Sequence, residues 1–92
     1  MERNEVSIHE VKVYLALKAA GSDWLTSRDI AGRSGVAGRT ARAHALKLVR
    51  LGLLDLAEVF PAHRYRLAGA AARRNVAHVQ RLEQACQVFG VG

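Results

Sequence analysis

The chain has 92 residues, half of them apolar and one a proline, and carries 14 Lys and Arg against 8 Asp and Glu, for a formal charge of +6. This length suits a single domain, the composition excludes general disorder, and a lone cysteine excludes an internal disulfide. Because the start MERNEVS is polar and no apolar run reaches about 18 residues, we expect a soluble cytoplasmic protein without a signal peptide or membrane span.

Positive charge is concentrated in the middle and the C-terminal third. From Arg28 to Arg81 the chain has 11 basic and 3 acidic residues. Such an excess favours a polyanionic partner.

A first helix is predicted over residues 8–20. Ser7 is followed three residues later by Glu10, the spacing of a reciprocal N-terminal cap, and Gly21 is typical of a helix end. The helix is apolar on two sides, because one stripe runs through Ile8 and Leu15 and a nearly opposite one contains Val13, Tyr14 and Leu17. The second side is either scattered surface residues or a contact between subunits.

Two further helices follow a short extended entry at Trp24 and Leu25. Thr26 and Asp29 repeat the capping spacing and open a short helix that Gly35 ends. A longer helix then runs to about residue 51, with a buried face of Ala41, Ala45 and Leu48.

A hairpin and a last helix complete the expected elements. Residues 54–59 and 64–67 alternate apolar and polar side chains around a turn at 61–63, which places Tyr65 and Leu67 inward and Arg64 and Arg66 outward. A helix over about 70–89 has an apolar stripe of Val76, Val79, Leu82, Cys86 and Phe89.

This order of elements resembles the winged helix-turn-helix family of small bacterial transcription regulators. The resemblance covers residues 8–67 and is carried by Thr26, Ile30, Ala31, Gly35, Thr40 and Gly52-Leu53-Leu54. It implies a mainly α fold with a small β-hairpin (α+β) and an additional C-terminal helix. We divide the chain into a tail (1–6), a winged helix-turn-helix domain (7–68) and a C-terminal amphipathic helix (69–92).

The resemblance implies that the helix over 38–51 enters the major groove of DNA. Its candidates for base contacts are Arg39, Thr40, Arg42, Ala43 and His44, although His44 is better explained as a residue packed at the margin of the core. Candidates for phosphate contacts are Ser27, Arg28, Arg33 and Lys47. His63 and Arg64 of the wing would touch either the backbone or the minor groove. Leu46 departs from the family pattern, and would touch a thymine methyl or be covered by a neighbouring element.

The last helix must bury its stripe, either on its own domain or against a second chain. We favour a homodimer, with interface candidates Tyr14, Leu17, Val76, Val79, Leu82, Cys86 and Phe89. A dimer would place two recognition helices about 34 Å apart over an inverted repeat.

The expected function is therefore a dimeric, sequence-specific, repressor-like transcription regulator associated with the nucleoid. A protein-interaction adaptor, and a sequence-tolerant DNA-binding protein of replication, partition or chromosome architecture, remain as alternatives. Histidines, cysteine and acids show neither metal-ligand spacing nor a catalytic pairing, so we expect no enzyme activity, metal or cofactor. We also expect no small-molecule ligand, because the residues leave little room for a separate binding domain.

Overall fold

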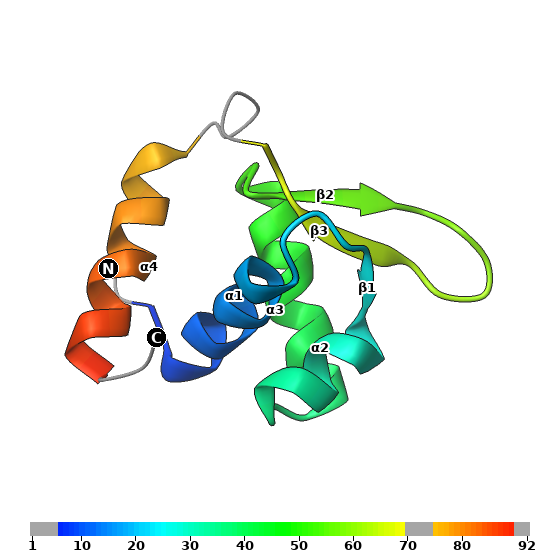
Figure 1. The fold of residues 1–92 in the computed structure, drawn as a ribbon, viewed down its shortest axis with the longest axis horizontal. Coiled ribbons are helices and arrows are strands. Elements are labelled where there is room, and N and C mark those ends of the chain that lie inside the picture. The colour runs from blue at the N-terminus through cyan, green and yellow to red at the C-terminus, as the bar shows by residue number, and fades with distance from the viewer. Residues whose placement is uncertain (1–5, 70–74, 90–92) are drawn as a thin grey trace.

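The computed structural model describes residues 6–69 and 75–89. Within these ranges the chain is an α+β fold of four helices and a small antiparallel sheet, consistent with a winged helix-like fold (Figure 1). The elements are α1 (Ile8–Ala20), β1 (Leu25–Thr26), α2 (Ser27–Ser34), α3 (Gly38–Arg50), β2 (Leu54–Ala57), β3 (Arg64–Leu67) and α4 (Val76–Phe89). The expected first turns of the last helix, at 70–74, lie outside the described residues. No helix in the described part could cross a membrane.

Local capping sets where α1 and α2 begin. At α2 the predicted reciprocal cap is complete, because the Thr26 side chain accepts from the Asp29 amide and the Asp29 carboxylate accepts from the Thr26 amide. At α1 the Ser7 hydroxyl accepts from the Glu10 amide at 3.1 Å, as expected. The Glu10 carboxylate has a different role from the predicted one: it binds Lys47 and His78.

The sheet has the order β1-β3-β2, with both pairings antiparallel. The hairpin of β2 and β3 is the one that the sequence predicts, and β1 adds to the outer side of β3. Tyr65 therefore occupies the central strand, opposite Leu25 on one side and Leu56 on the other. Its side chain is buried and Arg64 next to it is exposed, so the predicted alternation is confirmed there.

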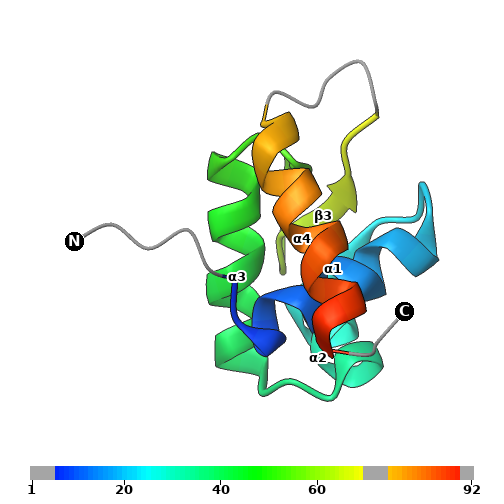
Figure 2. The same cartoon turned by 90° about the vertical axis from the view of Figure 1, so that its left-hand side faces the viewer.

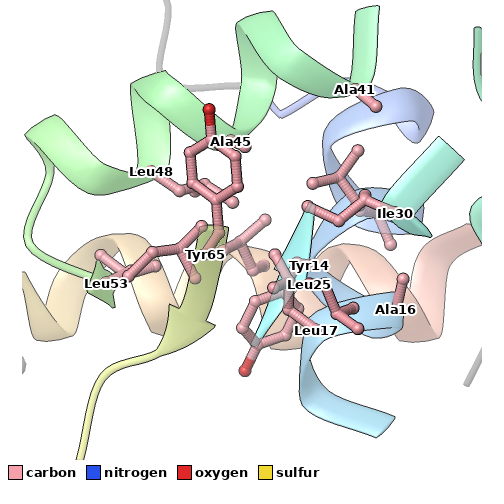
Figure 3. Close-up of a cluster of buried hydrophobic side chains, with 14 of the residues drawn as sticks. Tyr14, Ala16, Leu17, Leu25, Ile30, Ala41, Ala45, Leu48, Leu53 and Tyr65 are labelled. Atoms are coloured by element: carbon pink, nitrogen blue, oxygen red, sulfur yellow. The ribbon is translucent and has the colours of Figure 1, made fainter. Parts of the chain in front are cut away.

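The core lies where the three N-terminal helices meet the sheet (Figure 3). Tyr14 and Leu17 of α1, Ile30 of α2, Leu48 of α3 and Tyr65 of β3 are all buried there. Gly35 joins α2 to the next segment with φ 75°, a left-handed conformation that side chains with a Cβ resist. The tight connection between α2 and α3 is thus explained by one residue.

Helix α4 packs against α1 of its own chain, on the side away from the sheet (Figures 1 and 2). Leu82, Ala85 and Cys86 are buried in this contact. The Tyr14 hydroxyl donates to the Glu83 carboxylate, and Lys18 Nζ lies 2.8 Å from the same group. The second apolar side of α1 is therefore covered within one chain, which explains why α1 is apolar on two sides.

Candidate nucleic-acid interface

One face of α3 presents cationic and small side chains to solvent. Burial of Ala41, Ala45 and Leu48 fixes the orientation of the helix. The opposite face then exposes Arg39, Arg42 and Ala43 in the N-terminal half, and Arg50 at the other end. The first turn of α3 contains no acidic residue, so the partial positive charge of the helix N-terminus adds to that of the arginines.

Three elements meet beside Arg42. A hollow of about 220 Å³ is lined by Ser27 at the start of α2, by Arg42, and by the wing residues Pro61, Ala62 and His63, with Tyr65 below them. Burial raises the pKa of Tyr65, and the positive charge of Arg42 opposes that rise. The structure thus brings together candidates that the sequence assigned separately to α2, α3 and the wing.

Arg64 belongs to the same side of the molecule. As the first residue of β3 it pairs across the sheet with Thr26, the residue that caps α2, and it is exposed. Hydrogen bonds from Thr26 lower the pKa of Asp29, and the charges of Arg33 and Arg64 lower it further. Arg64 therefore lies close to the N-terminal turn of α2, in which Arg28 is exposed.

Two candidates for phosphate contacts lie elsewhere. Arg33 lines a hollow of about 430 Å³ between α1 and α2 together with Lys12, Leu15 and Ala19, and no wing residue borders it. Lys47 Nζ is 2.7 Å from Glu10 Oε1. The charge of Lys47 is thus neutralised inside the fold, although 41% of its side chain remains exposed.

Glu10 is the centre of a buried polar cluster that we did not predict. Its carboxylate is 1% exposed and binds Lys47 through one oxygen and His78 Nε2, at 2.6 Å, through the other. Burial raises the pKa of Glu10, but the hydrogen bonds and charges of Lys47 and His78 outweigh burial, so the pKa lies below its usual value. One carboxylate therefore joins α1, α3 and α4.

The sequence contains a signal for this cluster. Glu10 lies within an apolar stretch of the first helix, and His78 precedes Leu82 by four residues, so both occupy positions that face a core. A buried acid requires a cationic or hydrogen-bonding partner, and Lys47 and His78 supply both.

The remaining α3 candidates are partly enclosed. Thr40 and His44 are half-buried, and burial together with the charges of Lys47 and His9 lowers the pKa of His44 against the opposing effect of Glu10. His44 thus lies at the margin of the core, as expected. Leu46 is half-buried and packs against the core cluster, which supports the alternative that a neighbouring element covers it.

The side chain of Arg66 contacts Trp24 and Asp55 next to the sheet. Its guanidinium lies 4.2 Å from the centre of the Trp24 ring and 3.2 Å from the Asp55 carboxylate. This arrangement orients Trp24 and leaves Arg64 as the exposed arginine of β3.

The residues expected at a dimer interface divide into two groups. Tyr14, Leu17, Leu82 and Cys86 are buried within one chain, because α1 and α4 cover each other. Val79 is half-buried, whereas Val76 and Phe89 are exposed, as is the neighbouring Val88. Of these interface candidates, only Val76, Val79 and Phe89 on the outer side of α4 therefore remain available to a second chain in the described fold.

Comparison with known proteins gives a likeness of fold. No family model matches the chain, and no curated protein matches it. A solved structure of BpsR from Bordetella bronchiseptica, a protein whose DNA binding is regulated by 6-hydroxynicotinic acid, superposes with a TM-score of 0.62 at 17% identity. The match covers 87% of this chain and 59% of BpsR, so this chain spans less than two thirds of that protein.

Proposed function

We propose that the chain is a sequence-specific double-stranded DNA-binding protein that regulates transcription and inserts α3 in the major groove. The observation that carries the proposal is the exposed face of Arg39, Arg42 and Ala43, which adjoins the wing and the start of α2. The likeness of fold to BpsR, a DNA-binding protein, supports it.

The exposed residues suit distinct parts of the duplex. A guanidinium of Arg39 or Arg42 can donate two parallel hydrogen bonds to guanine O6 and N7, and the methyl group of Ala43 can contact a thymine methyl. The exposed Arg28 and Arg64 and the half-buried Ser27 bind phosphates in this proposal and fix the register. We leave Lys47 out of this set because Glu10 neutralises it.

Selection of duplexes from a randomised pool at about 150 mM salt tests sequence specificity, because nonspecific attraction is weakened there. Enrichment of a defined motif is expected, and Arg42→Ala should relax the preference at one base pair by about 1–3 kcal/mol. Arg33→Ala removes the same charge from the hollow beside α1 and is the matched control, with the motif unchanged. Binding without enrichment would instead support a sequence-tolerant role in replication, partition or chromosome architecture.

We further propose a homodimer formed through the outer side of α4. Val88 is 75% exposed and borders a hollow of about 230 Å³, which is also lined by the apolar residues Val6, Ala85 and Phe89 and by Arg81 and Gln84. A second copy packed there would pair two recognition helices on one face of the duplex, so the enriched motif should be an inverted repeat.

Analytical ultracentrifugation tests the dimer. Val88→Glu should shift the protein to monomers, because it places a charge in the proposed contact. Gln87→Glu adds the same charge at an exposed neighbouring position and should not. A monomeric wild-type chain, alone and on DNA, would contradict the dimer.

Two rival functions have direct readouts. For an adaptor, duplex binding would be absent or would lack the steep salt dependence of phosphate neutralisation. The second rival is regulation by a small molecule, because 6-hydroxynicotinic acid regulates DNA binding by BpsR. Our proposal includes no ligand, so 6-hydroxynicotinic acid should leave duplex binding by this chain unchanged.

A further inference from the structure

The tip of the wing carries an apolar side chain that neither the core nor the proposed DNA contacts use. Phe60 is 95% exposed, more than any other large apolar side chain in the described part of the chain. Val59, Pro61 and Ala62 are also exposed. We call these four residues the apolar tip, which the exposed His63 and Arg64 follow directly.

The apolar tip adjoins the proposed recognition face. Pro61 and Ala62 border the same hollow as Arg42 of α3 and Ser27 of α2. Figure 1 shows the loop between β2 and β3 at the opposite end of the molecule from α4. A duplex that received α3 would therefore meet the apolar tip, whereas a second chain bound to α4 would not.

The chemistry of the duplex limits where a benzyl ring can bind. Phosphates attract the cations that follow the tip, but they gain nothing from an apolar ring. Base steps in the minor groove do accept apolar side chains, which partly unstack the bases and kink the duplex. His63 and Arg64 suit the negative potential of a narrow minor groove beside such a step.

We propose that Phe60 is a wedge that enters a base step of the minor groove and bends the DNA. The proposal rests on the DNA-binding function above and adds a second mode of recognition to it. Besides hydrogen bonds from α3, the protein reads how easily a step unstacks, and it favours pyrimidine–purine steps such as TA.

A bending assay tests the wedge with an A·T-rich duplex that contains one TA step and carries a fluorophore at each end. At low salt, wild-type protein should bring the ends closer. Phe60→Ser should weaken binding about tenfold and remove the bend, but should keep the salt slope because no phosphate contact is lost. Phe60→Leu should retain the bend, since leucine also serves as a wedge. Arg64→Ala should reduce the salt slope instead.

Photocrosslinking locates the ring independently. With p-benzoylphenylalanine in place of Phe60, crosslinks should map to the nucleotides of the TA step. The same group in place of Gln87, an exposed residue of α4 outside the proposed dimer contact, is the control and should give none. Because Phe60 and Gln87 are both exposed, circular dichroism should show the same fold for all variants.

Three results would overturn the wedge. If wild-type protein binds with a steep salt dependence but Phe60→Ser bends the duplex equally, the wedge fails and the DNA-binding function stands. If no duplex is bound under any condition, both fail together. If Phe60→Ser changes only self-association, the ring is a protein contact and the wedge is wrong.

Discussion

The carboxylate of Glu10 in α1 accepts a hydrogen bond from Nε2 of His78 in α4 at 2.6 Å, and both side chains are buried. The other oxygen of the same carboxylate binds Lys47 of α3. Helix α4 is therefore held to the helix that carries Arg39 and Arg42 through a single charged group.

Glu10→Gln should destabilise the protein by about 2 kcal/mol, because it removes the countercharge of Lys47 and one of the two buried oxygen acceptors that bind Lys47 and His78. The free energy of unfolding in urea measures this. Asp55→Asn is the control, since Asp55 and Arg66 are more than a third exposed and such pairs contribute at most about 1 kcal/mol. Equal losses in the two variants would contradict the central role of Glu10.

The free energy of unfolding should also depend on pH through the ionisation of Glu10. Its folded pKa lies below the ordinary value of 4.5, so its contribution is complete above pH 4.5 and is lost as the pH falls through the folded pKa. The stability difference between wild type and Glu10→Gln should therefore shrink on acidification. Asp29, whose pKa is lowered too, loses its contribution in both proteins, so the difference isolates Glu10. A difference that is constant from pH 7 to about pH 3 would refute this assignment.

The same substitution at two glycines of one segment should have opposite effects. Gly32 lies inside α2 with open space around an added Cβ, so Gly32→Ala should stabilise by about 0.5–1 kcal/mol. Gly35 has φ 75°, so Gly35→Ala should destabilise by about 1–2 kcal/mol although nothing would clash. Thermal unfolding midpoints that move in the same direction would show that backbone conformation does not decide the effect.

The alkylation rate of Cys86 should measure how firmly α4 packs against α1. Burial raises the pKa of its thiol, and the charge of Glu83 raises it further, so alkylation at pH 8 should be slow in the folded protein. Weaker docking in Glu10→Gln should speed the reaction about tenfold, while both proteins react equally fast in urea. Identical rates without urea would mean that α4 detaches independently of Glu10.

Much of the fold could be predicted because its signals are local. The first helix begins and ends at the predicted residues, and Thr26, Asp29 and Gly35 fix the ends of α2 through backbone geometry. The exposed face of α3 also followed from helical spacing, which placed Ala41, Ala45 and Leu48 inward.

The packing of α4 could not be predicted in the same way. An apolar stripe shows that a surface must be buried, but it does not identify the chain that buries it. The second side of α1 and the stripe of α4 were expected to meet a partner, whereas Tyr14, Leu17 and Leu82 lie together in one core. Glu10 was interpreted as a cap because its true partners lie 37 and 68 residues away.

The strand order β1-β3-β2 has a consequence for how the chain folds. Leu25 pairs with Tyr65, so β1 can join the sheet only when the loop formed by the 39 residues between them closes. The hairpin of β2 and β3 and the contact between α2 and α3 join residues that are near in sequence, and their loop-closure entropy is smaller. We therefore expect β1 to join the sheet after the hairpin has formed, which places the ordering of the α2 N-terminus, where Ser27 and Arg28 lie, after that step.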